Sequence, residues 1–369
     1  MNIALVHEHL AQDGGAEKVL KVFQDMFPGA PTYTMVYNPA TTNSAFAGKK
    51  IIPSFIQSLP WGSRHYRWYL PLMPSAVERF NLQEYDVVLS SASGFAKGVI
   101  TRPDAVHICY CHSHTRYLWN DTYDYVENLA YPRIFKRGIV APYLSYLRTW
   151  DRIAADRVDY FIANSSSVQQ GIRKYYRRES TVIHPPVATQ HFSVAPTIGN
   201  YYLTGGRLVA YKRFDLVVQA CNRLGVFLKV FGVGPEEKKL RSLAKDNIEF
   251  LGKIPDVELP RLYNQAIAFI NPQIEDFGIT VVEAMASGRP VIAYRKGGAL
   301  ETVIPGKSGV FFDEQEWEAL ADTIIRFKPK DYNPHEVRAW AENFGERQFA
   351  QKIRRFIETH STIPPGTVQ

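Results

Sequence analysis

Cysteine is scarce in this sequence, with three residues in a chain of 369. Three cysteines cannot make the disulfide framework of a small secreted protein, which favours a reducing compartment. The N-terminal residues MNIALVHEHL contain no basic segment followed by a cleavage site, so we expect no secretion signal. Long apolar runs are also lacking, since none reaches the roughly 18 residues of a membrane-spanning helix. Together these absences predict a cytoplasmic protein.

Several common ligand-binding motifs are missing too. The chain has no G-x-G-x-x-G, the fingerprint of a nicotinamide-dependent dehydrogenase, and no Walker sequence G-x-x-x-x-G-K-[S/T]. It also has no Asp-x-Asp pair that could chelate a metal–diphosphate complex. A zinc site within residues 109–114 is disfavoured, because Cys109 and Cys111 would face one side of a strand and His112 and His114 the other. We therefore predict a protein that binds no metal.

Positive charge is in excess, with 43 Lys and Arg against 36 Asp and Glu, a net charge of +7. This excess favours anionic partners such as phosphates, nucleotides or membrane surfaces. No recognisable nucleic-acid-binding motif is present, so we expect no nucleic acid partner. Residues 61–74, WGSRHYRWYLPLMP, interleave aromatic and basic side chains. They have two interpretations: a solvated face over a packed helix, or peripheral contact with anionic lipid at the inner face of the cell membrane.

Short apolar runs alternate with segments of helix length, which predicts parallel sheets covered on both faces, an α/β fold class. The predicted strands cover 3–6, 87–90, 106–109, 160–163, 201–204, 227–231, 268–271 and 291–293, with helices such as 16–26 and 215–224. The pattern begins twice, at Met1 and near Tyr201, and the Pro-rich residues 184–200 are interpreted as a linker. We therefore predict two doubly wound domains, 1–190 and 191–344, and a final amphipathic helix over 338–359.

Two loops that follow predicted strands are candidates for phosphate binding. Gly14 and Gly15 lie between a strand and a helix, where small residues let the backbone approach an anion. Arg207 and Lys212 follow the strand at 201–204, at the end where an open α/β sheet binds ligands. Guanidinium and ammonium groups suit a diphosphate. A tight turn and a charged surface loop would explain the same residues without a ligand.

The segment from Glu275 to Glu283 is the most informative. Glu275 follows the strand at 268–271, and Gly278 begins a helix that ends near Gly288. The free N–H groups at the start of this helix would face a ligand. The two glutamates would repel phosphate and suit hydroxyl groups instead. A ligand with hydroxyls at both ends and phosphates between them, such as a nucleotide sugar, fits this arrangement.

These segments together form a recognisable pattern. The Glu-x7-Glu segment, the Arg207–Lys212 loop and the sequence GGAE at 14–17 resemble retaining glycosyltransferases of the GT-B fold in the GT4-like family. FGVGP at 231–235, FLGKI at 250–254 and GRPVIA at 288–293 are similar to the nucleotide-side loops of that family. The motifs occur in the right order over nearly the whole chain. YCHS at 110–113, the following RYLW at 116–119 and HPPV at 184–187 resemble bacterial mannosyltransferases of O-antigen and exopolysaccharide assembly.

The resemblance implies two Rossmann-like domains facing a cleft, with a C-terminal helix, about 345–360, that crosses back to the first domain. It implies that Arg207 and Lys212 neutralise the donor diphosphate, that Glu275 holds sugar hydroxyls, and that His112 lies near the transferring sugar. The remaining residues implied to contact the donor are Gly14, Gly15, Gly232, Ile254, Phe277, Gly278, Ile279 and Glu283, of which Glu283 would bind the ribose.

The implied activity is metal-independent, retaining transfer of a hexose, with mannose from GDP-mannose as the expected donor. The implied acceptor is a saccharide, in particular a lipid-linked one, in polysaccharide biosynthesis. No cofactor is expected besides this donor substrate. A UDP- or ADP-sugar donor stays open, as does a non-catalytic subunit on the same fold that binds a sugar nucleotide or a polysaccharide.

Overall fold

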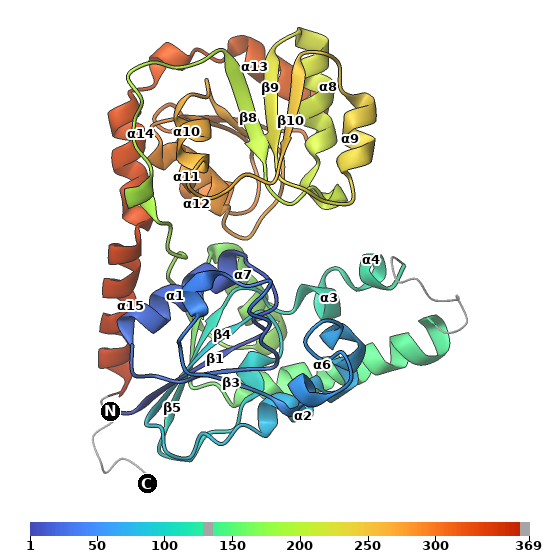
Figure 1. Cartoon of the computed structure of the whole chain (residues 1–369), viewed down its shortest axis with the longest axis vertical. Helices are drawn as coiled ribbons and strands as arrows, with labels where there is room; N and C mark the ends of the chain where they lie inside the picture. Colours follow the sequence, from blue (N-terminus) through green and yellow to red (C-terminus); the bar gives the residue numbers. More distant parts are fainter. Residues whose placement is uncertain (128–135, 362–369) are drawn as a thin grey trace. The chain divides into compact units, whose positions relative to one another are not determined.

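The chain divides into two compact units (Figure 1). The computed structural model describes residues 1–127 and 136–361. The first unit comprises Met1–His184 together with the chain from Ala350, and the second comprises Pro185–Phe349. The boundaries therefore differ by a few residues from the predicted 190/191 and 344/345. Most of the predicted linker belongs to the second unit, where Val187 and Gly345 form a parallel β-bridge.

The first unit is built on a seven-stranded sheet in the order β3-β2-β1-β4-β5-β6-β7, in which all paired strands are parallel. The strands are β1 (Ile3–His7), β2 (Thr32–Thr34), β3 (Ile51–Pro53), β4 (Val87–Ala92), β5 (Val106–Cys111), β6 (Tyr160–Ala163) and β7 (Ser180–Val182). The helices are α1 (Gly15–Met26), α2 (Met73–Glu78), α3 (Arg116–Trp119), α4 (Thr122–Glu127), α6 (Ala141–Asp156) and α7 (Ser166–Gly171).

The second unit has a six-stranded parallel sheet in the order β10-β9-β8-β11-β12-β13. The strands are β8 (Tyr201–Gly205), β9 (Phe227–Phe231), β10 (Ile248–Gly252), β11 (Phe269–Asn271), β12 (Val291–Tyr294) and β13 (Gly309–Phe312). The helices are α8 (Phe214–Leu224), α9 (Glu237–Leu243), α10 (Leu259–Asn264), α11 (Ile279–Ala286), α12 (Ala299–Thr302), α13 (Trp317–Arg326) and α14 (Pro334–Ala341).

Side-chain alternation along the strands explains why both faces of the second sheet are covered. Leu203 of β8 and Val291 of β12 pack into one apolar cluster with α10, α11 and α14. Their neighbours Tyr202 and Ile292 pack into a second cluster with α8 and α13. Successive side chains of a strand point to opposite faces, so a strand that is apolar at every position needs helices on both sides.

The order of strands determines where a ligand site can form. In each sheet the chain builds outward in one direction from the first strand and then returns to build in the other direction. The reversal lies between β1 and β4 in the first unit, and between β8 and β11 in the second. Loops that leave the carboxyl ends of such a strand pair diverge and leave a crevice for a ligand. The candidate residues are therefore sought at these two places.

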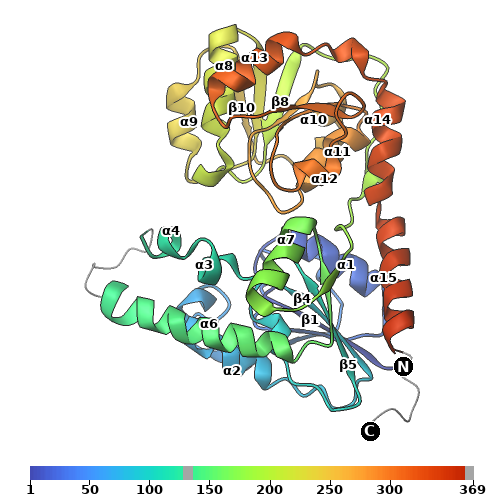
Figure 2. The ribbon, with the colours of Figure 1, turned by 180° about the vertical axis from the view of Figure 1, so that it is seen from behind.

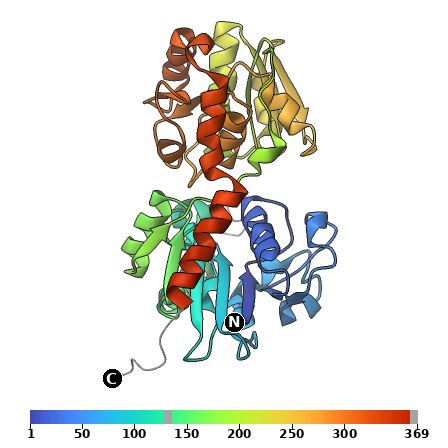
Figure 3. The same ribbon diagram turned by 90° about the vertical axis from the view of Figure 1, so that its left-hand side faces the viewer.

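The C-terminal helix differs from the prediction in its start. A single helix over 338–359 is wrong, because the 3₁₀ turn η10 (Glu342–Phe344) and the extended backbone of Gly345 separate α14 from α15 (Glu346–Ser361). From Ala350 onward α15, the last helix in Figures 2 and 3, belongs to the first unit. Its Phe356 and His360 contact Tyr160 of β6. The expected return of the last helix to the first domain is thereby confirmed.

Candidate active site

In the second unit, Lys212 and Glu275 meet at the crevice between β8 and β11. Lys212 ends the 3₁₀ turn η8 (Ala210–Lys212) after β8, and its Nζ lies 2.8 Å from Oε1 of Glu275 in the loop after β11. The two side chains are 11% and 23% exposed, so the pair is accessible to a ligand. Gly206 allows this approach, because a Cβ at that position would lie 3.3 Å from the Lys212 ammonium.

The start of α11 lies beside Glu275. Gly278 precedes the helix with φ of +89°, a conformation that glycine adopts without strain, and its Cβ position would be 3.7 Å from Oε2 of Glu275. The loop is held from behind, since the Gly298 N–H donates to the Glu275 carbonyl over 2.8 Å. A Cβ on Gly298 would come within 2.3 Å of the Phe277 Cα. Phe277 is buried and Ile279 packs against the same apolar cluster, so both support the helix start.

Gly232 is required for the shape of the Arg207–Lys212 loop. It has φ of +104°, and a Cβ there would lie 1.8 Å from the Gly206 carbonyl oxygen. Ile254 is half-buried against the apolar core of the second unit. Arg207 is exposed, and within the described residues its guanidinium forms no ion pair. The structure thus brings Lys212, Glu275 and the start of α11 together and leaves Arg207 at the surface.

Glu283 has a partner within the protein. It is buried on α11, and its Oε2 accepts a hydrogen bond from the Tyr263 hydroxyl over 3.1 Å. Burial, with a further contribution from this carboxylate, raises the pKa of Tyr263 well above its ordinary value, so the hydroxyl stays a donor. A ribose-binding role for Glu283 remains a prediction.

In the first unit, strands β1, β4 and β5 place three side chains in contact at their carboxyl ends. Nδ1 of His7 lies 3.0 Å from Oγ of Ser91, and the same Oγ lies 2.8 Å from Nε2 of His112. On the other side of His7, its Nε2 is 3.8 Å from Oε1 of Glu17 in the first turn of α1. Oε2 of Glu17 lies beneath Gly14, 3.0 Å from where a Cβ would be. The glycine loop before Gly15 is thus connected to His112.

The His112 imidazole is neutral over the physiological range. Burial, with a smaller contribution from the neighbouring His7, lowers the pKa of His112 to about 3. A group with so low a pKa stays unprotonated at neutral pH. Such a group acts as a hydrogen-bond donor or acceptor.

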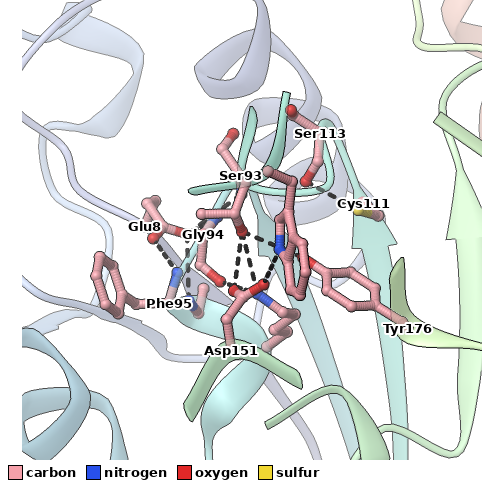
Figure 4. Close-up of polar contacts among 12 residues, drawn as sticks. Glu8, Ser93, Gly94, Phe95, Cys111, Ser113, Asp151 and Tyr176 are labelled. Carbon is pink, nitrogen blue, oxygen red and sulfur yellow. Dashed lines mark hydrogen bonds and ion pairs between the residues drawn. The ribbon is translucent and has the colours of Figure 1, made fainter. Parts of the chain in front are cut away.

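A buried polar cluster beneath this site has no local sequence signal. The carboxylate of Glu8, at the end of β1, accepts hydrogen bonds from four successive backbone N–H groups after β4, those of residues 93–96 (Figure 4). Nearby, Lys97 forms a buried ion pair with Asp151 of α6 at 2.5 Å. Burial opposes the charge on Lys97, but Asp151 offsets this and the pKa of Lys97 lies above its ordinary value.

Asp151 also shapes the turn that leads to Arg116. Its Oδ1 accepts from the Thr115 hydroxyl and its Oδ2 from the Trp119 indole N–H, both at 2.9 Å. Thr115 has φ of +56°, a costly conformation for a threonine that these contacts maintain. The result is a cavity of about 540 Å³ whose lining includes Glu8, Tyr66, Arg67, Arg116, Tyr117 and Tyr125. Tyr66 and Arg67 belong to the aromatic and basic segment 61–74, and Arg116 and Tyr117 to the RYLW motif, but none of the six residues was predicted as a site residue.

Metal ligands do not gather in the described part of the chain. Residues 1–127 and 136–361 contain no cluster of three or more His, Cys, Asp or Glu side chains suited to an ion. Cys109 and Cys111 are buried thiols, and burial raises the pKa of Cys109 to about 12. Among the helices in the same ranges, none is both long and apolar enough to span a bilayer.

Two family models match the chain in succession. The model described as Glycosyltransferase Family 4 matches residues 14–191, and the model described as Glycosyl transferases group 1 matches residues 188–357. Each of the two units is therefore matched over most of its length.

Curated relatives share shorter stretches. The chain is 30% identical over 193 residues to the putative colanic acid biosynthesis glycosyltransferase WcaL of Salmonella typhimurium, which is 46% of this chain and 48% of that protein. It is 33% identical over 136 residues to the GDP-mannose-dependent alpha-(1-6)-phosphatidylinositol monomannoside mannosyltransferase of Mycolicibacterium smegmatis, 32% of this chain and 36% of that protein. The matches thus span half or less of these relatives' length.

Solved structures share the fold over nearly the whole chain. HepE of Anabaena in complex with UDP superposes with a TM-score of 0.74 at 18% identity, covering 97% of this chain and 100% of that one. Sucrose-phosphate synthase from Thermosynechococcus elongatus gives a TM-score of 0.70 at 17% identity, covering 96% and 98%. With the two parallel sheets, the crevice residues and both family models in agreement, the chain belongs to the GT4-like glycosyltransferases and has the GT-B fold.

Proposed function

We propose that this protein transfers a hexose from a nucleoside diphosphate sugar to a saccharide acceptor, with retention of anomeric configuration and without a metal ion. The Lys212–Glu275 pair beside the start of α11 is the observation that carries the proposal. An ammonium group and free helix N–H groups suit the diphosphate, and a carboxylate suits sugar hydroxyls. A site for a free nucleotide alone would not need this carboxylate beside the cation.

The catalytic contribution of this site is electrostatic. As the anomeric carbon separates from the diphosphate oxygen, negative charge builds on the leaving group. Lys212 and the N-terminus of α11 are held in place before the reaction, so they stabilise that charge without reorganising. Glu275 contacts Lys212 through Oε1, which leaves Oε2 available to accept from the sugar hydroxyls. Arg207, which is exposed, is the second proposed diphosphate ligand.

The choice of GDP-mannose as donor is supported by the printed names of relatives. One curated relative is named as GDP-mannose-dependent, and another is a mannosylfructose-phosphate synthase. HepE was solved with UDP and with UDP-glucose, which keeps a uridine nucleotide as the competing donor. We propose mannose as the transferred sugar and guanosine as the base.

The acceptor is proposed to bind the cavity of the first unit. Its tyrosines offer flat faces to sugar rings, and Arg67 and Arg116 offer charge to a phosphate. A lipid-linked saccharide carries both groups. Next to this cavity, Trp61 and Trp68 are 65% and 63% exposed, which supports peripheral contact with an anionic bilayer at the inner face of the cell membrane.

Substitution of Lys212 tests the donor site. We expect Lys212→Ala to lower kcat about 100- to 1,000-fold, the usual cost of removing one contact to transition-state charge. Lys229→Ala removes another Lys–Glu pair of the same unit, with Glu249 at 3.3 Å, and should leave kcat unchanged. Equal activity of the two variants would refute the proposed site. Retention requires that the product, observed by NMR, has the same anomeric configuration as the donor. Independence of a metal ion requires that excess EDTA leaves the rate of transfer unaltered.

Flotation with liposomes tests the membrane contact. The wild type should float with vesicles containing anionic lipid at low salt, and Trp68→Ser should reduce the floating fraction. Ile325→Ser removes a comparably exposed apolar side chain, 67% exposed, from the second unit and should have no effect. If the wild type stays at the bottom of the gradient, the protein does not bind the bilayer by itself.

A further inference from the structure

Four polar side chains form a buried row from α1 to His112. The order is Glu17, His7, Ser91 and His112, with separations of 3.8, 3.0 and 2.8 Å. The first three side chains are almost completely buried, at 2%, 1% and 0% exposure. They come from α1, β1 and β4, so the row joins three elements at the crevice of the first unit. Buried polar groups are retained only when each is oriented by a partner.

The proton positions in this row follow from the charge at its first member. Burial alone would raise the pKa of Glu17, but its contact with His7 and the hydrogen bond from its own backbone N–H bring the pKa below its ordinary value. Glu17 is therefore a carboxylate, which can only accept. At 3.8 Å it is too far from His7 for a hydrogen bond, and within residues 1–127 and 136–361 Nε2 of His7 has no hydrogen-bond partner. For a neutral imidazole, the attraction to this carboxylate favours the proton on Nε2, the ring nitrogen that faces it.

The remaining protons are then determined one by one. With its proton on Nε2, His7 has a lone pair on Nδ1, which accepts the single hydroxyl proton of Ser91. The Ser91 oxygen is left as an acceptor, and it lies 2.8 Å from Nε2 of His112. His9, which lies near His7, adds no positive charge, because burial lowers its pKa. Nε2 of His112 must therefore carry the proton, and Nδ1 must carry the lone pair.

We propose that Glu17, His7 and Ser91 are positioning residues that hold His112 in its Nε2–H tautomer and present the Nδ1 lone pair to a sugar hydroxyl. This inference rests on the proposed transferase function, in which His112 lies beside the transferring sugar. Because the pKa of His112 is near 3, it would accept a hydrogen bond without removing the proton. The sugar hydroxyl would donate its proton to Nδ1 of His112. Because the O–H bond then points at the ring, the lone pairs of the hydroxyl oxygen have a fixed direction.

The tautomer can be observed directly, independently of catalysis. In protein labelled with ¹⁵N-histidine, long-range ¹H–¹⁵N correlation distinguishes a protonated from an unprotonated ring nitrogen. We expect a protonated Nε2 and an unprotonated Nδ1 for His112 at neutral pH in the wild type. Ser91→Ala and Glu17→Leu should each shift His112 towards a mixture of tautomers, although Glu17 does not touch it. A protonated Nδ1 in the wild type, or an unchanged tautomer in both variants, would overturn the proposal.

A neighbouring serine supplies the matched control. Ser90 is equally buried on β4 and lies 2.8 Å from Nε2 of His107, on the opposite face of the strand. Ser91→Ala should lower kcat about tenfold, the rate equivalent of one hydrogen bond, with less than about a twofold change in the donor KM. Ser90→Ala should leave kcat and the His112 tautomer unchanged. An equal loss of kcat in both variants would mean that Ser91 acts only through stability.

The two levels of the hypothesis fail in different ways. If His112→Ala keeps full kcat while the wild-type tautomer is as expected, the role of His112 in transfer is wrong and the row remains a device that fixes its proton. If His112→Ala lowers kcat but the tautomer does not respond to Ser91→Ala or Glu17→Leu, the transferase assignment stands and the positioning role is refuted.

Discussion

At the scale of single residues, the site depends on buried polar groups that are each held by specific partners. Glu8 accepts from the backbone after β4, Lys97 is paired with Asp151, and His107 and His112 contact neighbouring serines of β4. Burial without such a partner would cost roughly 1–3 kcal/mol per group. A change in the protonation of one of these groups should therefore change the free energy of unfolding.

His107 gives the protein a pH-dependent stability. Burial lowers the pKa of His107 to about 4, against about 6.5 in an unfolded chain. The folded state therefore favours the neutral ring, and this contribution is present above pH 6.5 and lost as the pH falls towards 4. Protonation of the unfolded chain over this range lowers the free energy of unfolding by about 3 kcal/mol.

The free energy of unfolding in urea should therefore depend less on pH across this window for His107→Asn than for the wild type. His335→Asn, at an exposed histidine, should reproduce the wild-type dependence. Parallel curves for all three proteins would contradict the assignment.

At the scale of elements, α15 is amphipathic and its apolar side belongs to the packing of the first unit. Ile353, Phe356 and Ile357 are buried, whereas Lys352 and the adjoining arginines are exposed. The helix begins only after Gly345, because the extended backbone at that residue interrupts the helical repeat. Apolar side chains do recur at helical spacing over 338–359. They belong to two helices, α14 and α15, because the spacing of apolar residues does not show where the backbone interrupts a helix.

Truncation of the apolar side of α15 should destabilise the first unit. Ile353 is fully buried, so Ile353→Ala removes packed methyl groups and leaves a cavity that the neighbours fill only in part. We expect a loss of about 2–5 kcal/mol in the free energy of unfolding. Lys352→Ala, one position earlier on the exposed side, should change it by less than about 0.5 kcal/mol. Equal stability of the two variants would show that α15 contributes little to the fold.

The sequence predicts the inner strands better than the edge strands of the two sheets. All eight predicted strands are present, and they are all the inner strands except the short β2; the four edge strands β3, β7, β10 and β13 were not predicted. The strands β2, β3 and β7 have only three residues each, and β7 (Ser180–Val182) is polar at two of them. An edge strand is half solvated and short, so it lacks the apolar run by which an inner strand is recognised.

The candidate site shows a similar division. Glycines and charged residues that directly follow a strand, such as Lys212 and Gly278, could be assigned from local sequence because the carboxyl end of a strand is where ligands bind. Glu8 and the Lys97–Asp151 pair could not. Their partners lie on other elements, and no local pattern distinguishes a buried, paired Lys from an exposed one. Such groups are found only when the strand order is known.

At the scale of the whole molecule, the chain consists of two units with separate sheets and separate apolar clusters. Each unit has its own crevice, with the Lys212–Glu275 pair in one and His112 and the 540 Å³ cavity in the other. A ligand that binds only one unit should therefore stabilise that unit's own unfolding transition. This property allows the donor nucleotide to be identified without an activity assay.

A nucleotide series followed by calorimetry makes this last prediction testable. At a concentration about 100 times its Kd, a bound ligand adds about 2.7 kcal/mol to the stability of the unit that binds it. We expect GDP to raise the melting temperature of the second unit more than UDP or ADP does, and NAD to have no effect. Lys212→Ala should abolish the shift, because the ammonium is proposed to contact the diphosphate, whereas Lys229→Ala should preserve it. A larger shift with UDP would reassign the donor, and a shift that survives Lys212→Ala would place the nucleotide elsewhere.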